Sequence, residues 1–248
     1  MTRRRWIADE VSADRAAIVG EHARHLAQVL RAQIGQQFEI STGSEVWQGR
    51  VIAVEAGRVE FELGDLIQQS APADITVAVS IFKFERMEWM IEKCTELGVA
   101  RIIPLIAARS EKHLVAAASK RLERWRRIAK QAAEQARRVW APEVSDPAKI
   151  RDLLAMEVSH RVLLSEIEKG VMLGEAISLD GSVLMAFGPE GGWKPEEILA
   201  FQEAGWTAAS LGANILRTET AVIAAVAVCT SGMKAQIAKR NSSRFSAT

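Results

Sequence analysis

The sequence predicts a two-part protein, in which a small β-rich N-terminal domain precedes an α/β domain with a mostly parallel sheet. The chain has 248 residues, a length between that of one and two average domains. Short segments rich in β-formers fill the first 70 residues, whereas apolar strands alternate with amphipathic helices from Ile75 onward. Hydrophobic residues make up 48% of the chain and charged residues 25%, which excludes a disordered, collagen-like or disulfide-rich protein.

The N-terminal domain is expected over residues 1–70. It contains a predicted helix at Glu21–Arg31, whose apolar residues fall on one side. The predicted strands after it are Gln37–Ser41, Glu45–Val54 and Arg58–Leu63. Short strands separated by glycine turns at this spacing favour a small β-barrel or sandwich. The segment Gln68–Asp74, which contains Pro72, is the predicted linker to the second domain.

The second domain is expected over residues 75–240 and a disordered tail over 241–248. Its predicted strands are nearly continuous apolar runs, as in a sheet that is covered on both faces. They are Ile75–Phe82, Arg101–Ala107, Val162–Ser165, Val183–Phe187 and Thr207–Leu211. The predicted helices are Glu85–Leu97, Ser119–Val139, Glu196–Ala204 and Glu219–Ile237. Gly98 ends the first helix and Pro195 introduces the third.

Charge, cysteine content and hydropathy limit the kinds of partner and the cellular location that we expect for this protein. The net charge of +1, from 32 basic and 31 acidic residues, does not by itself point to nucleic acid. Cys94 and Cys229 each lie in an apolar stretch, so buried thiols in a reducing compartment are expected. The histidines do not make a zinc spacing, and no metal is expected. The longest apolar run, Ala221–Cys229, is too short to cross a bilayer, so we expect a cytoplasmic protein without a membrane anchor.

Two loops at predicted strand ends are the candidate functional site. The first, Gly188–Trp193, reads Gly-Pro-Glu-Gly-Gly-Trp and directly follows the strand Val183–Phe187. Glycines let the backbone approach a ligand closely, and open α/β sheets bind ligands at the carboxyl ends of their strands. The segment matches no dinucleotide or triphosphate fingerprint, which argues against a nucleotide-dependent oxidoreductase. A tight strand-to-helix connection without a ligand is the alternative.

The second loop, Leu211–Ala221, follows another strand and leads into the last helix. It carries apolar residues, a lone cation at Arg217 and a carboxylate at Glu219, with Thr218 placed to cap the helix. Together the two loops predict a cleft that holds an apolar and polar ligand mainly through backbone hydrogen bonds. The alternative is a capped helix with Arg217 as a surface ion-pair partner.

Both loops, in this order, resemble the last two motifs of the SPOUT methyltransferases. In detail the chain is similar to the bacterial small-subunit rRNA uridine methyltransferases of the RsmE type, which modify ring nitrogen N3. The resemblance extends from about Arg3 to Lys234. Its other matching stretches are His25-Leu26, Val29-Leu30-Arg31, Gly35, Lys83, Glu85–Glu88, Lys93, Thr95–Val99, Arg109-Ser110, Ala133–Gln135 and Arg138.

The resemblance implies a fold, a cofactor and an assembly. The fold is a PUA-like RNA-binding β-barrel joined to an α/β domain whose C-terminus forms a trefoil knot, a topology that general threading rules argue against. The cofactor is S-adenosyl-L-methionine, and the enzyme is a homodimer. The implied cofactor contacts are Gly188, Pro189, Glu190, Gly191, Gly192, Leu211, Gly212, Ile215 and Leu216. Trp193 departs from the family, which more often has Phe there.

Methylation at N3 of uracil needs help because the N3–H group is a weak acid. A fixed cation would stabilise the anion that develops on the base, and we assign this role to Arg217. Glu219 is the second predicted catalytic residue, either orienting Arg217 or accepting the proton. Holding the two reactants in line would supply much of the remaining acceleration.

N3 lies on the Watson–Crick edge, so the target uridine has to be single-stranded or flipped out of its stack. Basic side chains are expected to hold the surrounding RNA backbone. The predicted RNA-binding residues are Arg3, Arg4, His25, Arg31, Arg109, Arg124, Arg127 and Arg138. As an alternative to RNA binding, the charged residues of Ser119–Arg138 form a solvated helix face. For His25 the alternative is a partly buried position in a helix.

The sequence therefore predicts an S-adenosylmethionine-dependent methyltransferase that acts on a uridine of 16S rRNA, within the small ribosomal subunit and without a metal. The same fold acting on another RNA base or a ribose hydroxyl is one alternative. A non-catalytic RNA-binding factor for ribosome assembly is another. The apolar final helix fits a two-fold interface, and burial in the monomer core explains it nearly as well.

Overall fold

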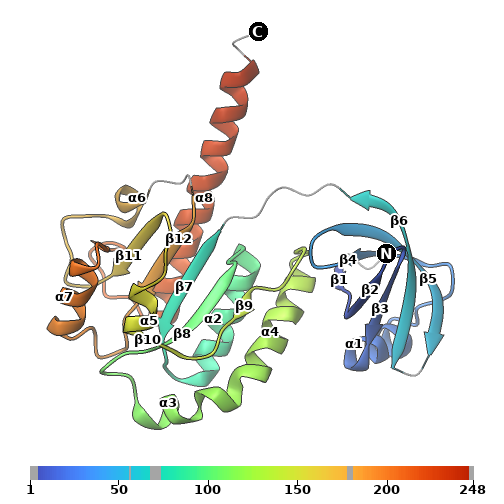
Figure 1. The fold of residues 1–248 in the computed structure, drawn as a ribbon, viewed down its shortest axis with the longest axis horizontal. Helices are drawn as coiled ribbons and strands as arrows, with labels where there is room; N and C mark the ends of the chain where they lie inside the picture. Colours follow the sequence, from blue (N-terminus) through green and yellow to red (C-terminus); the bar gives the residue numbers. More distant parts are fainter. Residues whose placement is uncertain (1–4, 56, 68–73, 178–180, 246–248) are drawn as a thin grey trace. The chain divides into compact units, whose positions relative to one another are not determined.

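A computed structural model describes residues 5–55, 57–67, 74–177 and 181–245, and the side chains of the last helix as far as residue 232. The chain forms two compact units, which are described separately (Figure 1). The small unit comprises Met1–Ala71 and a return segment, Lys130–Ala141. The large unit comprises Pro72–Ala129 and Pro142–Thr248. The return segment was expected in the second domain, but its contacts group it with the first.

The small unit is built on one curled sheet. Its strands are β1 (Arg5–Ile7), β2 (Glu10–Ser12), β3 (Arg15–Val19), β4 (Gln37–Ser41), β5 (Val46–Glu55) and β6 (Arg58–Ile67), in the order β1-β4-β5-β6-β3-β2. The β1–β4 pair is parallel and the other pairs are antiparallel. Trp6, Ile18, Ile40 and Phe61 fill its core. Because β1 and β2 are opposite edges of this order, the sheet is a half-barrel. The sequence analysis predicted β4, β5 and β6 but missed β1, β2 and β3.

The helical part of the small unit is shorter than predicted. Helix α1 (Gly20–Arg24) continues as a π-helical turn, η1 (His25–Val29), instead of one helix over Glu21–Arg31. Leu26 is buried in the core, as its place on the apolar side of the predicted helix requires. Arg31 has a φ of 51°, a left-handed conformation in which a helix does not continue.

Charged contacts hold the return segment to the small sheet. Arg5 donates from Nε and Nη2 to the carboxylate of Glu39 at 3.1 and 3.0 Å, and Arg137 also donates to Glu39. The third guanidinium nitrogen of Arg5, Nη1, donates to the carbonyl of Arg137. His22 Nδ1 lies 3.3 Å from the buried carboxylate of Glu134. The contacts made by Arg137 and Glu134 join residues about a hundred positions or more apart, so sequence pattern alone gives no sign of them.

The large unit has a parallel sheet, as predicted. Its strands are β7 (Ile75–Ser80), β8 (Arg101–Ile106), β9 (Glu143–Val144), β10 (Ala148–Lys149), β11 (His160–Leu164), β12 (Val183–Phe187) and β13 (Thr207–Ala209). The order is β10-β8-β7-β12-β11-β13, with β9 also beside β8, and every pairing is parallel. The strand sequences are apolar on both faces because helices cover both faces.

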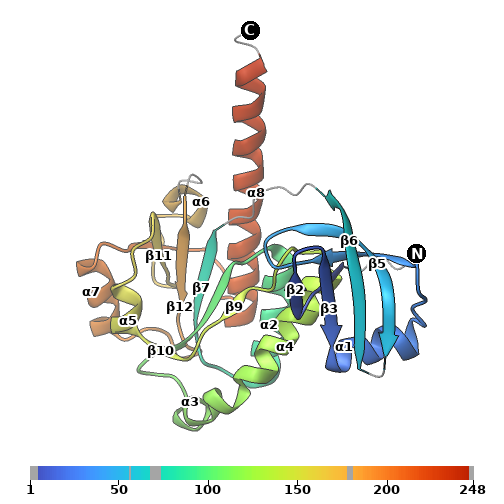
Figure 2. The ribbon, with the colours of Figure 1, turned by 45° about the vertical axis from the view of Figure 1, so that its right-hand side comes forward.

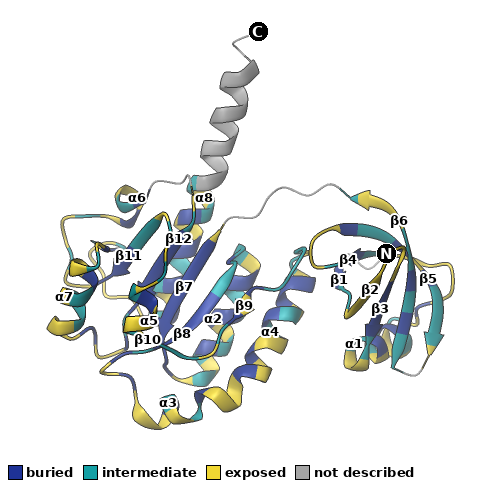
Figure 3. Cartoon of the chain, viewed as in Figure 1, coloured by how far each residue is buried: buried dark blue, intermediate teal, exposed yellow. Residues whose placement is uncertain are grey.

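The helices divide between the two faces of this sheet. They are α2 (Phe84–Leu97), α3 (Lys112–Ala118), η2 (Ser119–Arg121), α4 (Leu122–Gln135), α5 (Ile150–Leu154), α6 (Leu173–Ala176), α7 (Pro195–Glu203) and α8 (Thr218–Phe245). Val77 and Val79 pack in one core with side chains of α2, α4 and α8, whereas Ala78 packs in the other with side chains of α5 and α7. This alternation along β7 is the period-two pattern of a strand. Figure 3 shows the central strands as buried.

Some helix ends differ from the predictions. The expected helix Ser119–Val139 is η2 followed by α4, and it ends at Gln135, after which Arg137 is left-handed. Helix α8 continues past the expected end at Ile237 to Phe245 and so enters the tail expected to be disordered (Figure 2). Residues 246–248 and most of the predicted linker, 68–73, lie outside the described residues. Gly98, with a φ of 101°, ends α2 as predicted.

Among the described residues, no helix is both long enough and apolar enough to span a bilayer.

The two thiols are buried, as predicted, and should be unreactive in the native protein. Burial raises the pKa of the Cys229 thiol to about 11 and that of the Cys94 thiol well above its usual range. The thiolate is the reactive form, so a raised pKa suppresses modification at pH 8. We expect an aromatic disulfide reagent to label neither cysteine in buffer and both in concentrated urea. Rapid labelling of the folded protein would contradict the burial of these residues.

Candidate functional site

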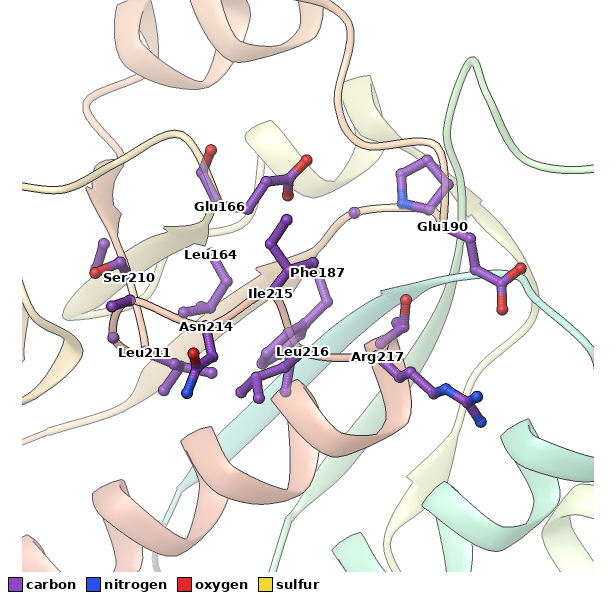
Figure 4. A pocket seen from close by; sticks show the side chains of 18 of the residues that line it. Leu164, Glu166, Phe187, Glu190, Ser210, Leu211, Asn214, Ile215, Leu216 and Arg217 are labelled. Atoms are coloured by element: carbon purple, nitrogen blue, oxygen red, sulfur yellow. The ribbon is translucent and has the colours of Figure 1, made fainter.

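The large unit contains a cavity at the carboxyl ends of β11, β12 and β13 (Figure 4). Its volume is about 380 Å³, which lies in the range of small-molecule sites. The residues that line it are Arg86, Leu164, Ser165, Glu166, Phe187, Gly188, Pro189, Glu190, Ala209, Ser210, Leu211, Gly212, Ala213, Asn214, Ile215, Leu216, Arg217, Thr218 and Ala221. Both loops singled out from the sequence thus meet at one cavity.

The first wall is the glycine turn, Gly188–Trp193, at the end of β12. The amide of Gly192 donates to the carbonyl of Pro189 at 2.8 Å and closes the turn. Gly192 has a φ of 70°, and a Cβ at this position would lie 2.6 Å from Glu166 Oε1. The positive φ favours glycine at this position, and a side chain here would also displace the carboxylate of Glu166.

Two side chains fix the glycine turn to its surroundings. The indole N–H of Trp193 donates to the carbonyl of Leu164 at 2.9 Å, and its ring meets Phe201 edge-on at 5.2 Å between centroids. Arg109 Nη1 donates to the carbonyl of Gly191 at 2.7 Å. The tryptophan that departs from the family pattern thus ties the end of β12 to the end of β11.

The second wall is the loop between β13 and α8. Leu216 and Ile215 are exposed, Ile215 at 87%, although both are apolar and face the cavity region. The amide of Ala221 donates to the carbonyl of Arg217 at 2.9 Å, which starts the hydrogen bonding of α8. Exposed aliphatic side chains beside a cavity provide a surface on which an apolar ligand group can be buried.

Charged groups gather at one side of the cavity. Arg86 Nη1 lies 3.1 Å from Glu190 Oε1, and its Nε lies 3.7 Å from Glu219 Oε1. Glu219 is buried and does not line the cavity. Arg217 is exposed and makes no ion pair within the described part of the chain, and Figure 4 shows its side chain pointing away from Leu211. Glu219 therefore pairs with Arg86, and no ion pair joins Glu219 to Arg217 among the described residues.

The cavity brings together most of the predicted cofactor contacts. Those that line it are Gly188, Pro189, Glu190, Leu211, Gly212, Ile215 and Leu216, together with the predicted catalytic Arg217. Gly191 and Gly192 belong to the turn but lie against Arg109 and Glu166 instead of the cavity. The sequence analysis missed Glu166, Ser210 and Asn214, which follow strands and could have been proposed from that position alone. Arg86 could not have been proposed in this way, because it precedes both loops by about a hundred residues or more.

The predicted RNA-binding residues of the large unit differ in their surroundings. Arg109 is exposed but holds the glycine turn. Arg124 forms a two-point pair with Glu88, from Nε at 2.7 Å and Nη2 at 2.8 Å. Arg127 is exposed on the same helix. Arg127 is therefore the residue of this set whose charge is most available to a phosphate.

The remaining predicted RNA-binding residues belong to the small unit. Arg3 and Arg4 lie outside the described residues. His25 is half-buried with its ring 6.0 Å from that of Trp6, which matches the alternative of a partly buried helix residue. Arg31 is exposed. Burial lowers the pKa of Arg138 to about 10, so it remains a cation at neutral pH.

The cavity suits an organic ligand better than a metal. It combines aliphatic and aromatic side chains, backbone groups of two loops, and the carboxylates of Glu166 and Glu190. Such a lining fits a molecule with an apolar ring, polar edges and a positive charge. Among the described residues, no group of three or more His, Cys, Asp or Glu side chains is placed to hold a metal ion.

Comparison with known families assigns a match to each unit. The family model described as an RNA methyltransferase domain matches residues 69–230. The model described as an RNA methyltransferase PUA domain matches residues 19–64.

Several relatives are similar over most of the chain. The ribosomal RNA small subunit methyltransferase E of Mycobacterium bovis is 33% identical over 230 residues, covering 87% of this chain and 87% of its own. The protein of the same name from Bacillus subtilis is 31% identical, covering 85% of this chain and 87% of its own.

Solved structures agree with these relatives. A ribosomal RNA small subunit methyltransferase E from Neisseria gonorrhoeae, bound to S-adenosyl methionine, matches with a TM-score of 0.82 and 31% identity, over 92% of this chain and 97% of its own. A methyltransferase from Legionella pneumophila in complex with the same cofactor matches with a TM-score of 0.80 and 28% identity, over 94% of this chain and 98% of its own.

The Trp193 hydrogen bond gives a stability prediction. Trp193→Phe keeps an aromatic ring against Phe201 but removes the donor to the Leu164 carbonyl. We expect a loss of about 1–2 kcal/mol in the free energy of unfolding, since a buried acceptor loses its partner. Urea denaturation followed by circular dichroism measures it. Trp206→Phe is the matched control, because this buried ring also packs against Phe201 but its indole nitrogen has no hydrogen-bond partner among the described residues. The control should cost less than Trp193→Phe, and equal effects at both positions would refute the proposed anchor.

Proposed function

The chain belongs to the ribosomal RNA small subunit methyltransferase E family, and from this premise we propose that it uses S-adenosylmethionine to methylate ring nitrogen N3 of a uridine in 16S rRNA. The substrate we propose is that RNA within the small ribosomal subunit. Methylation of another base or of a ribose hydroxyl is the alternative for the same site.

One observation supports this proposal most directly: the two loops that carry the family motifs line a single cavity of about 380 Å³. The lining fits the cofactor. The apolar side chains Leu211, Ile215 and Leu216 suit its adenine ring, and the backbone of both loops offers hydrogen bonds to its polar edges. Glu190 and Glu166 supply negative charge for its positively charged end.

The bound cofactor supplies an electrophilic methyl group on a sulfonium. The protein has to hold the uracil ring in line with that methyl group and stabilise the charge that develops as N3 gives up its proton to solvent water at the cavity mouth. Arg217 lies at the mouth of the cavity with a solvent-facing guanidinium that is not committed to an ion pair within the described residues. We assign to it the stabilisation of the uracil anion at an exocyclic oxygen. Glu219 is buried behind Arg86, so it acts on this site through its neighbours.

The RNA is held outside the cavity by exposed cations. In the large unit, α3 and α4 carry exposed basic side chains, of which Arg127 is one. In the small unit, Arg31 is exposed, and the family model that matches there is one of an RNA methyltransferase PUA domain. Phosphate contacts position an RNA without reading its sequence, so recognition of the uridine itself falls to the cavity mouth.

We also propose that the enzyme is a cytoplasmic homodimer with a knotted C-terminus, as its family resemblance implies. Helices α2 and α8 run side by side in the same direction, since Arg86 lies near Glu219 and the Thr230 hydroxyl donates to the Leu97 carbonyl at 3.3 Å. Trp89 on α2 and Val228 on α8 are 49% and 44% exposed. Exposed large apolar side chains on packed helices favour a second copy as the partner.

Mapping of methylated nucleotides tests the proposed function. Small-subunit rRNA from cells with and without this gene is digested and compared by mass spectrometry. We expect one 3-methyluridine to disappear in the deletion and to return when the gene is restored. A missing ribose methylation, or no missing methyl group at all, would reject the proposed reaction.

Arg217 gives a kinetic prediction. Arg217→Met removes the cation while keeping the length of the side chain, and we expect kcat to fall about 10²- to 10³-fold. The dissociation constant for the cofactor should change little, because the guanidinium points away from Leu211 in the cofactor cavity. Single-turnover kinetics and calorimetry measure the two effects. Near-normal turnover would remove Arg217 from the mechanism.

Arg127 gives a prediction on RNA affinity. If Arg127 contacts a phosphate, Arg127→Ala should weaken RNA binding and reduce the slope of log affinity against log salt by about one. Fluorescence anisotropy across a salt series measures this slope. Arg151→Ala, at an exposed position on α5, is the control and should leave it unchanged. Equal slopes for the wild type and Arg127→Ala would favour the alternative that Arg127 lies on a solvated helix face and does not contact RNA.

A further inference from the structure

We propose that Arg86 is a positioning residue that ties the two walls of the cavity together by bridging Glu190 and Glu219. The inference rests on the proposed function, because the cavity it concerns is the proposed cofactor site. Glu190 belongs to the glycine turn, and Glu219 lies in the first turn of α8, directly after the Arg217 loop. One guanidinium thus contacts both elements from a third, α2.

The geometry of Arg86 suits a bridge. Its Nη1 lies 3.1 Å from Glu190 Oε1 and its Nε 3.7 Å from Glu219 Oε1, so different nitrogens face the two carboxylates. A guanidinium presents several donors in one rigid plane, whereas a lysine ammonium is a single point of charge. The helix α2 that carries Arg86 is itself fixed by Met87 and Met90, which are fully buried in the core.

Glu219 depends on this contact more than Glu190 does. Its side chain is only 8% exposed, and its Oε2 has no hydrogen-bond partner among the described residues. The amino end of α8 offers some compensation for the charge, and within the described part of the chain Arg86 is the one cation at ion-pair distance from Glu219. Without Arg86 a buried carboxylate would lack its counter-charge, which strongly favours a rearrangement of the first turn of α8. The Arg217 loop would move with that turn.

Glu190 connects the same cation to the opposite wall. Its side chain is 45% exposed and lines the cavity. Arg109 and Trp193 hold the far side of the glycine turn. Arg86 joins the turn to the side formed by α2 and α8. Walls that are already fixed at the correct separation lose less conformational freedom when a ligand binds. Arg86 therefore favours cofactor binding without having to touch the cofactor.

The test measures cofactor affinity and loop protection in matched variants. Calorimetry with S-adenosylmethionine is carried out on the full-length wild type, Arg86→Met, Arg86→Lys, Glu190→Gln and the double variant Arg86→Met/Glu190→Gln. Arg151→Met is the control, since Arg151 pairs with Asp152 on α5, away from the cavity lining. Backbone hydrogen exchange of the same proteins without cofactor reports directly on the two loops.

We expect Arg86→Met to raise the dissociation constant about three- to tenfold, as for the loss of partly exposed ion pairs. Arg86→Lys should recover part of the affinity. The double variant should lose less affinity than the two single effects added together, because both substitutions break the contact between Arg86 and Glu190. In the absence of cofactor, exchange at 188–192 and 211–219 should be faster in Arg86→Met and unchanged in Arg151→Met.

Several results would overturn the inference. An unchanged cofactor affinity in Arg86→Met would do so, and so would strictly additive effects in the double variant. A raised KM for RNA with normal cofactor affinity would show that Arg86 contacts phosphate instead. If the wild type itself bound no S-adenosylmethionine, the proposed function would fail, while the exchange measurement on the unliganded protein would still decide whether Arg86 bridges the loops.

Discussion

The parallel register of three strands determines where this protein can carry out chemistry. Leu164 pairs with Phe187 on one side and with Ala209 on the other, so β11, β12 and β13 all end at the same level. Their loops, which are far apart in sequence, must therefore leave the sheet side by side. The cavity is the space between these loops, and its walls begin at strand ends whose last residues, Leu164, Phe187 and Ala209, are buried. A shift in strand register would separate the loops and remove the site.

Packing below the cavity gives these short loops their rigidity. The Ser80 hydroxyl of β7 donates to the carbonyl of Phe187 at 2.8 Å, at the point where the glycine turn begins. Trp193 returns from the turn to Leu164. On the side of the cavity where the charged groups gather, Arg86 of α2 contacts Glu190 of the glycine turn and Glu219 of α8. Backbone hydrogen bonds, the Trp193 indole and the guanidiniums of Arg109 and Arg86 thus hold the walls, which leaves the apolar side chains and Arg217 available to ligands.

Local sequence signals predicted the elements that depend on local forces. The apolar runs of β7, β11 and β12, the glycine that ends α2 and the two motif loops were all found from spacing. Contacts between residues that are distant in sequence were not predicted. The return segment joins the small unit through Arg137 and Glu134, whose partners precede them by about a hundred residues. Arg86 was recognised only as part of a matching stretch, because its role depends on two carboxylates contributed by other elements. Strands β1 to β3 are short and partly polar, and no period distinguishes them.

Hydrogen exchange with and without S-adenosylmethionine tests the central claim most directly, namely that both loops form one cofactor pocket. On this account, saturating cofactor slows exchange at the amides of 188–192 and 211–217 together, while the small unit and α5 are unaffected. Protection of one loop without the other, or of neither while the cofactor still binds, would contradict the shared pocket and the mechanism built on it.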